Sequence, residues 1–280
     1  MRAVKYILLM LAAMLCTATG RGQDTLPERP VVGFYGLRAG SVHLHDTYLS
    51  PLNYAGWGIR PAYWREQAMR FAPRHWSGRL ALDAGFAHTM NPARNASIYR
   101  TDFAASWAML RRWRLNGGLT LSVGPMTRLC AGILFSDRNG NNPVSVIADW
   151  TIGAAGQAAY RMNLGALPVT WTYRTSFPLI GAFFRPSYGE SYYEIYLGNH
   201  SGLARCAWPG NFRYWPNEIC ATLHLGATSL VVGYELAVQS SSASHLVSRY
   251  VSHSLVCGIQ CAWSAINTRR QPESDIIMPY

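Results

Sequence analysis

Large apolar residues alternate with small or polar residues along most of this chain, from Leu80 almost to its end. Every second residue is large and apolar from Leu230 to Val238, and cysteines join the apolar positions of the same pattern from Leu255 to Trp263. A repeat of two residues is typical of β-strands. No stretch of comparable length has the helical period, so the pattern predicts an all-β chain.

The two faces of these expected strands differ in a way that indicates a membrane. One face is large and apolar, and the other consists mostly of Gly, Ala, Ser and Thr, with few charges. Apolar residues outside and polar residues inside are the pattern of an antiparallel transmembrane β-barrel, and a soluble β-sandwich in the periplasm is the alternative. Aromatic residues near the expected strand ends would form the interfacial girdles: Trp76, Trp113, Trp150, Trp171 and Trp263.

Short and long connections alternate along the chain, which is the rule for barrels with short periplasmic turns and longer extracellular loops. The short connections are 73–78, 114–118, 163–167 and 226–229, and the longer ones are 48–54, 90–96, 136–142, 184–216 and 240–245. We expect ten strands, or twelve if the long extracellular loop at 184–216 contains two more. The expected spans are 30–45, 55–72, 77–90, 97–113, 117–135, 143–162, 167–183, 217–226, 229–240 and 245–265.

The first 20 residues have the three parts of a secretory signal peptide. Arg2 and Lys5 form a positive segment, residues 7–16 are apolar, and a small-residue cleavage site follows at 18–20. Cys16 suggests lipidation as an alternative, but Leu15 stands where a small residue is expected. The sequence thus predicts a signal peptide at 1–20, an outer-membrane barrel at 21–265 and a polar tail at 266–280.

Charge narrows the possible partners. Only 14% of the 280 residues are charged, yet Lys+Arg number 25 against 14 Asp+Glu, and Lys5 is the only lysine. The arginines are dispersed and carry no nucleic-acid-binding signature, so no nucleic acid partner is expected. Guanidinium groups pair well with lipid phosphates. The expected partners are outer-membrane lipids and lipopolysaccharide, together with the barrel-assembly machinery during biogenesis.

Three segments carry a family resemblance: DTYLSPLNYAG at 46–56, FRPSYGESYYEIYLGN at 184–199 and SHSLVCG at 252–258. With them the chain resembles an uncharacterised family of Gram-negative outer-membrane β-barrel proteins, a domain of unknown function. The resemblance implies a barrel fold and an outer-membrane location, and it implies no activity. Relatives often end at an aromatic residue in the last strand, whereas this chain runs about 17 residues beyond Trp263.

Some barrels of this size are enzymes, so a nucleophile next to a base would be a candidate catalytic pair. A lipid-cleaving barrel needs a serine activated by a histidine that a third polar group orients. His253 and Ser254 are adjacent candidates, with Glu235 as a further ionisable candidate. Alternation directs His253 toward lipid, where together with Arg249 it would contact phosphates or headgroups. No metal-ligand spacing or phosphate-binding glycine loop is present, and no metal or cofactor is expected.

Alternation directs ionisable side chains of both signs toward the lumen, where we expect them to form a network because unpaired charges are costly there. The lumen candidates are Arg79, Asp83, Asp149, Arg174, His224 and Glu235.

The segment at 185–199 combines aromatic residues, carboxylates and an arginine, which suits a sugar or lipid headgroup; the same loop could instead fold inward as a plug. Its binding candidates are Arg185, Tyr188, Glu190, Tyr192, Tyr193 and Glu194.

Five cysteines follow the expected signal peptide. Cys206 and Cys220 bracket a turn-rich segment and are a candidate disulfide in an oxidising compartment.

Altogether the sequence predicts an outer-membrane barrel with a structural, surface-binding or small-solute-passage role. A barrel hydrolase that acts on lipid or peptide is the alternative, and no small-molecule or glycan ligand can be named.

Overall fold

A computed structural model describes residues 29–140, 142–186, 197–198, 202–226 and 228–263. Within them all regular structure is β-strand except for one short 3₁₀ turn, η1 (Asn116–Gly118). No helix among these residues is long and apolar enough to span a membrane. The strands are β1 (Val31–Asp46), β2 (Tyr54–Ala68), β3 (Trp76–Met90), β4 (Ser97–Arg114), β5 (Leu119–Ser136), β6 (Val144–Leu164), β7 (Leu167–Phe184), β8 (Ala204–Ala207), β9 (Phe212–His224), β10 (Thr228–Ala243) and β11 (Leu246–Trp263).

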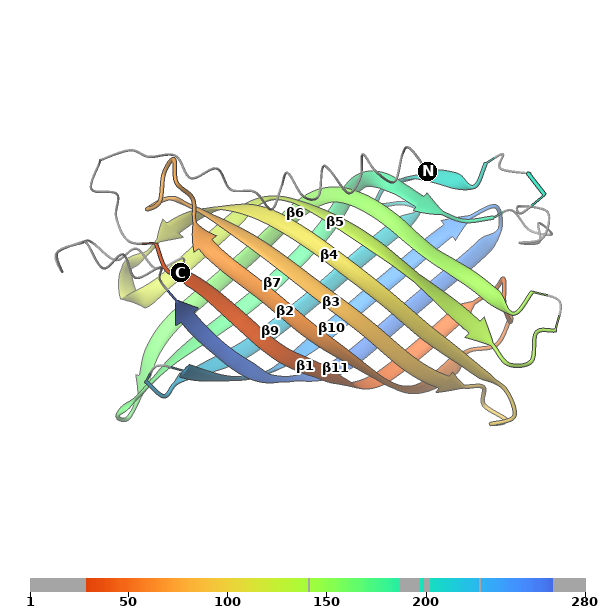
Figure 1. Cartoon of the computed structure of the whole chain (residues 1–280), viewed down its shortest axis with the longest axis horizontal. Helices are drawn as coiled ribbons and strands as arrows, with labels where there is room; N and C mark the ends of the chain where they lie inside the picture. The colour runs from red at the N-terminus through yellow and green to blue at the C-terminus, as the bar shows by residue number, and fades with distance from the viewer. Residues whose placement is uncertain (1–28, 141, 187–196, 199–201, 227, 264–280) are drawn as a thin grey trace.

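Ten of these strands form a closed antiparallel barrel (Figure 1). Each strand pairs with the next along the chain from β1 to β7, β7 pairs with β9, and β11 closes the ring against β1. Strand β8 is short and pairs with the last residues of β7, beyond the part of β7 that β9 covers. The predicted ten-stranded barrel is confirmed, and closure of the ring rules out both the two-sheet sandwich and a twelve-stranded ring.

The two ends of the barrel differ in their connections. One end, at the left of Figure 1, carries the start of β1 and the end of β11, and we call it the turn end; the opposite end is the loop end. Three expected bounds need correction. The strand expected at 55–72 ends at Ala68. The connection expected at 240–245 is a two-residue turn at Ser244 and His245, both with positive φ, because β10 and β11 stay paired up to Ala243 and Leu246. The ninth strand begins at Phe212 rather than at residue 217.

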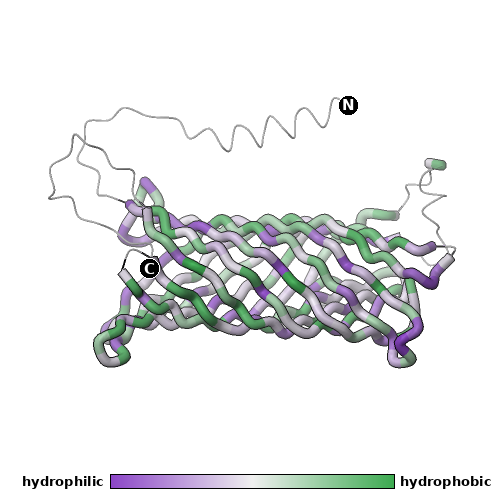
Figure 2. The backbone as a smooth tube through the Cα atoms, turned by 60° about the horizontal axis from the view of Figure 1, so that its bottom comes forward, coloured by the Kyte–Doolittle hydropathy of each residue, from purple (hydrophilic) through white to green (hydrophobic). Residues whose placement is uncertain are grey.

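The alternation of the sequence becomes an outer and an inner face of the barrel wall. Hydrophobic and hydrophilic positions alternate along the strands in Figure 2. The inner positions hold glycine, small polar residues and paired charges, and the outer positions are largely apolar. Exposed outer residues include Tyr35, Leu37, Trp57, Ile59, Phe103, Trp107, Leu129, Ile133, Trp150, Ile152, Leu255 and Ile259.

Inner apolar residues also pack the lumen in layers, which the alternation did not predict. Val42, Leu44, Ile98 and Leu134 form a buried cluster toward the loop end, and a second cluster centres on Phe34 and Trp64, whose rings stack 5.6 Å apart. These clusters leave the middle of the lumen to charged residues.

Candidate functional site

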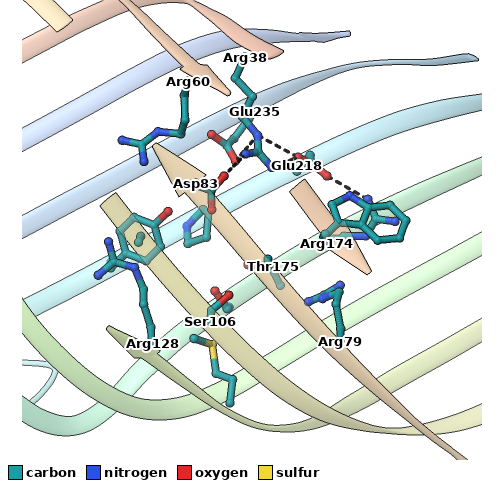
Figure 3. Close-up of a pocket in the computed structure, with 17 residues that line it drawn as sticks. Arg38, Arg60, Arg79, Asp83, Ser106, Arg128, Arg174, Thr175, Glu218 and Glu235 are labelled. Carbon is teal, nitrogen blue, oxygen red and sulfur yellow. Dashed lines mark hydrogen bonds and ion pairs between the residues drawn. The ribbon is translucent and has the colours of Figure 1, made fainter. Parts of the chain in front are cut away.

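Arg38 is the centre of an ion-pair cluster inside the barrel (Figure 3). Its guanidinium lies 2.5 Å from the Asp83 carboxylate on β3, 2.7 Å from Glu218 on β9 and 3.2 Å from Glu235 on β10. All four side chains are largely buried. Because Arg38 is on β1, one cation holds four strands together through the interior.

A second group of charges lies beside the first. Arg60 on β2 binds Asp102 on β4 through both carboxylate oxygens, at 3.0 and 3.2 Å. Arg100 donates to the same carboxylate at 2.8 Å and also donates to the Gln239 side chain on β10 at 2.8 Å. The Arg100 guanidinium stacks 4.0 Å from the Tyr250 ring. Both arginines therefore have polar partners, and Arg100 has an aromatic partner as well.

Three further lumen cations lie on β3, β5 and β7. Arg128 pairs with Asp149 and stacks 3.9 Å from the Tyr214 ring. Arg174 binds Glu218 at 3.0 Å and lies 4.3 Å from the Trp64 ring. Its Nε and an Arg79 nitrogen both donate to the Gln157 side-chain oxygen.

These side chains leave only a small cavity between them. It has a volume of about 100 Å³, and its lining includes Arg38, Arg79, Arg174, Ser106 and Tyr214. That space holds a few water molecules but is well below the several hundred cubic ångströms typical of a small-molecule pocket. The middle of the lumen is thus filled by protein rather than open.

A larger groove of about 460 Å³ lies at the loop end. The connections after β1, β3 and β5 form it, and the Asn139 side chain donates to the Leu49 carbonyl across it. Its lining combines apolar Leu49 and Tyr54 with polar Asn91 and Arg138.

The six lumen candidates all have inward side chains, and five of them belong to the charged groups just described. Asp83 and Glu235 meet at Arg38, Asp149 meets Arg128, and Arg79 and Arg174 meet at Gln157. His224 is separate. It lies near the turn end, where its two ring nitrogens bond the hydroxyls of Thr170 (2.8 Å) and Ser229 (3.1 Å).

Sequence reasoning missed the residues that connect these candidates. The missed residues are Arg38, Arg60, Arg100, Asp102, Arg128 and Glu218. Alternation could have found Arg128 and Glu218, because each lies an odd number of residues from an outer apolar position of its strand (Leu129 and Ile219). In β1 the inner face is itself apolar at Phe34 and Val42, so the pattern around Arg38 was ambiguous.

The structure separates the catalytic candidates. His253 is exposed on the outer face, where its Nδ1 lies 2.6 Å from the Tyr234 hydroxyl. Ser254 is buried on the inner face and is paired in register with Glu235. Adjacent residues of a strand point to opposite faces, so His253 and Ser254 cannot act together.

Only one binding candidate of the 185–199 segment can be placed. Arg185 is buried at the loop end and binds Asp46 through two nitrogens, at 3.1 and 3.4 Å. This pair joins the end of β7 to the end of β1. The other five lie outside the described residues: Tyr188, Glu190, Tyr192, Tyr193 and Glu194.

The proposed Cys206–Cys220 disulfide is wrong in this structure, where both thiols are free. Cys206 pairs in register with Ala182 and Cys220 with Thr172. Ten residues along β7 correspond to about 33 Å, whereas bridged cysteines have Cα atoms within about 7 Å. The segment between them is a turn at 208–211 followed by the first half of β9.

Thiol labelling should report this arrangement. Without reductant, a maleimide is expected to modify exposed Cys206 in the folded protein and to reach Cys220, which is 1% exposed, only after unfolding. Both thiols react in the unfolded protein because neither is in a disulfide. A Cys206–Cys220 linked peptide in a non-reduced digest, detected by mass spectrometry, would contradict the expectation.

Among the described residues, no three His, Cys, Asp or Glu side chains lie close enough together to hold a metal ion. Arginines cross-link the lumen carboxylates instead, as in the groups around Arg38 and Asp102.

Comparison with known proteins places the chain near an uncharacterised group. A family model described as "Protein of unknown function (DUF3316)" matches residues 6–270. No curated protein matches the chain.

Three solved barrels show distant similarity. The translocator domain of autotransporter NalP from Neisseria meningitidis has a TM-score of 0.40 at 10% identity, with 94% of this chain and 96% of that chain covered. CdiB from Acinetobacter baumannii has a TM-score of 0.26 at 8% identity, covering 83% and 60%. The P. putida toluene transporter TodX has a TM-score of 0.22 at 8% identity, covering 85% and 90%. Values this low give no information about what the chain binds or transports.

Proposed function

The chain belongs to the DUF3316 family of proteins of unknown function, and we propose that it is an outer-membrane β-barrel with an occluded lumen. In this role it is a scaffold that presents its lipid-facing wall and its loop end to the envelope and does not conduct solutes. The loop end is then extracellular and the turn end periplasmic. Its partners are outer-membrane lipids and lipopolysaccharide, and the barrel-assembly machinery inserts it.

The observation that carries this proposal is contact across the full width of the lumen. In a ring of ten strands, β4 lies opposite β10 and β2 lies opposite β7. The Arg100–Gln239 hydrogen bond joins the first pair of strands, and the stacking of Arg174 on Trp64 joins the second. Side chains that meet from opposite walls leave no continuous path for a hydrated solute, as in other narrow barrels filled by side chains.

Membrane placement is supported by the outer wall. Large apolar residues cover it, and tryptophans gather where a girdle is needed. Trp76, the first residue of β3, and Trp263, the last residue of β11, lie at the turn end. Trp113 on β4 and Trp171 on β7 lie close to the same end, and Trp150 on β6 lies toward the loop end. The groove between the connections after β1, β3 and β5 is the surface that we assign to binding at the cell exterior.

Conductance separates a closed scaffold from a pore. Purified protein refolded in detergent and added to planar lipid bilayers is expected to give no stepwise conductance, because the ion pairs around Arg38 and Asp102 block the lumen. A general porin at the same protein-to-lipid ratio is the positive control. A gel band that shifts on boiling shows that the sample is a folded barrel. Reproducible steps of uniform size from that sample would refute the occluded lumen.

A further inference from the structure

Three polar side chains gather on the outer wall, with His43 and Arg249 as further exposed polar residues nearer the loop end. Ser41 on β1, His253 on β11 and Tyr234 on β10 are all exposed, with Leu37, Leu236 and Leu255 on the same face around them. Polar and ionisable groups that face lipid are costly, and they mark functional sites more often than structural ones. The lumen network accounts for none of these three residues.

The β-ladder brings the serine and the histidine together. Ser41 and His253 are directly opposite each other in the antiparallel β1–β11 pair, a position in which Cβ atoms are about 4.5–5.5 Å apart. Gly40 makes the close approach possible, because a Cβ at this position would collide with the carbonyl oxygen of His253. The Ser41 hydroxyl has no hydrogen-bond partner among the described residues and is therefore available to react.

Tyr234 orients the histidine ring. Its hydroxyl lies 2.6 Å from Nδ1 of His253 and comes from β10, on the side of β11 away from Ser41. When Nδ1–H donates to the Tyr234 oxygen, Nε2 keeps its lone pair and can accept a proton. A nucleophile beside a base that a third group orients is the arrangement used in covalent catalysis.

The depth of this trio fits the ester region of a lipid. Trp263, at the turn end of β11, and His253 are ten residues apart, or about 25 Å along the barrel axis at the usual strand rise and tilt. That is the height of the apolar band of an outer-membrane barrel, so His253 lies at its opposite boundary. Arg249, on the same face and four residues nearer the loop end, is exposed and suited to bind a phosphate.

We propose that Ser41, His253 and Tyr234 form a lipid-facing esterase site that hydrolyses an acyl ester of a phosphate-bearing membrane lipid. Ser41 is the nucleophile, His253 the general base and acid, and Tyr234 a positioning residue. This inference rests on the membrane placement proposed above and adds an activity to it.

The reaction uses water as its second substrate. The Ser41 oxygen attacks the ester carbonyl carbon while Nε2 of His253 takes the hydroxyl proton. The bond to the lipid alcohol breaks, and the alcohol leaves with that proton, so the acyl group remains on Ser41. Water then attacks the acyl-enzyme and gives a proton to His253. A free fatty acid leaves, and the proton returns to the Ser41 oxygen.

The test is fatty-acid release by the full mature chain, refolded and checked by its heat-shifted gel band. Two kinds of vesicle distinguish the lipid sources: one of phosphatidylglycerol and phosphatidylethanolamine, and one that also contains lipid A. Mass spectrometry measures the free fatty acid. We expect release from at least one kind of vesicle, and Ser41→Ala to reduce it about 100-fold or more. A long-chain fluorophosphonate is expected to add to Ser41 and not to the Ser41→Ala protein.

Two further variants sharpen the result. Ser254→Ala removes the neighbouring inner hydroxyl and should leave release unchanged, while Tyr234→Phe should lower kcat about tenfold with KM unchanged. The proposal fails if folded protein releases no fatty acid from either vesicle, or if Ser254→Ala removes the activity and Ser41→Ala does not. A sample without a heat-shifted band would instead count against the barrel itself, and so against the placement on which the proposal depends.

Discussion

Replacing Arg38 with methionine is expected to lower the free energy of unfolding of the barrel by about 3–5 kcal/mol, the usual cost of removing one partner of a buried ion pair. Arg38 is the cation that Asp83, Glu218 and Glu235 share. Without it three carboxylates remain in a space of about 100 Å³, where water can solvate them only in part. Glu218 keeps Arg174 as a second partner, but Asp83 and Glu235 lose the only cation that each contacts directly among the described residues.

Urea unfolding of protein refolded in lipid vesicles, read from the heat-shifted band, measures this loss as a lower midpoint. Arg65→Met is the matched control, because Arg65 is exposed on the outer face of β2 near the turn end, and it should change stability by no more than about 0.5 kcal/mol. Adding Asp83→Asn and Glu235→Gln to Arg38→Met should restore part of the loss, since the remaining Glu218 is paired. An unchanged midpoint for Arg38→Met alone would show that the cluster contributes little.

The second large effect is expected on the outer wall. Leu129 is 58% exposed near the middle of β5, and Leu129→Arg should destabilise the barrel in lipid by about 2–4 kcal/mol. The reason is the low polarity of the bilayer, because a guanidinium at this position has neither water nor a carboxylate to solvate it. In a water-soluble protein the same substitution at an exposed position would be nearly neutral.

Leu225 provides the matched control for that prediction. It is 63% exposed but lies in the connection between β9 and β10 at the turn end, outside the expected apolar band. Leu225→Arg should therefore leave the urea midpoint in vesicles unchanged within about 0.5 kcal/mol. Equal effects of the two substitutions would mean that the outer wall does not face lipid.

Most strands of the barrel were predictable because the pattern that identifies a strand is encoded in neighbouring residues. The period of two that runs through Leu230, Val232 and Tyr234 identified a strand and its outer face together, since side chains alternate across a strand. The predictions failed where the local signal was weak. The β9 strand was expected to begin at residue 217, because Pro216 and the turn-like residues before it hide a strand that starts at Phe212.

The lumen was predictable only one residue at a time. Alternation directs Asp83 and Glu235 inward, but the residue that joins them, Arg38, lies on a strand with apolar inner neighbours. The partner of an inward charge is chosen across the ring, as for Arg100 and Gln239, which are 139 residues apart. The number of strands and the stagger between them decide such a pairing, and neither quantity is encoded near either residue.

Ser41, His253 and Tyr234 on the outer wall show the same difference between local and long-range information. The sequence by itself determined that the chain is built of β-strands, that His253 faces outward and that Ser254, its neighbour, faces inward, because these properties follow from the backbone geometry of a single strand. Only the tertiary structure placed Ser41 opposite His253, through the pairing of the first strand with the last. Closure of the barrel brings together residues more than 200 positions apart, and the register at that seam depends on all the strands between them.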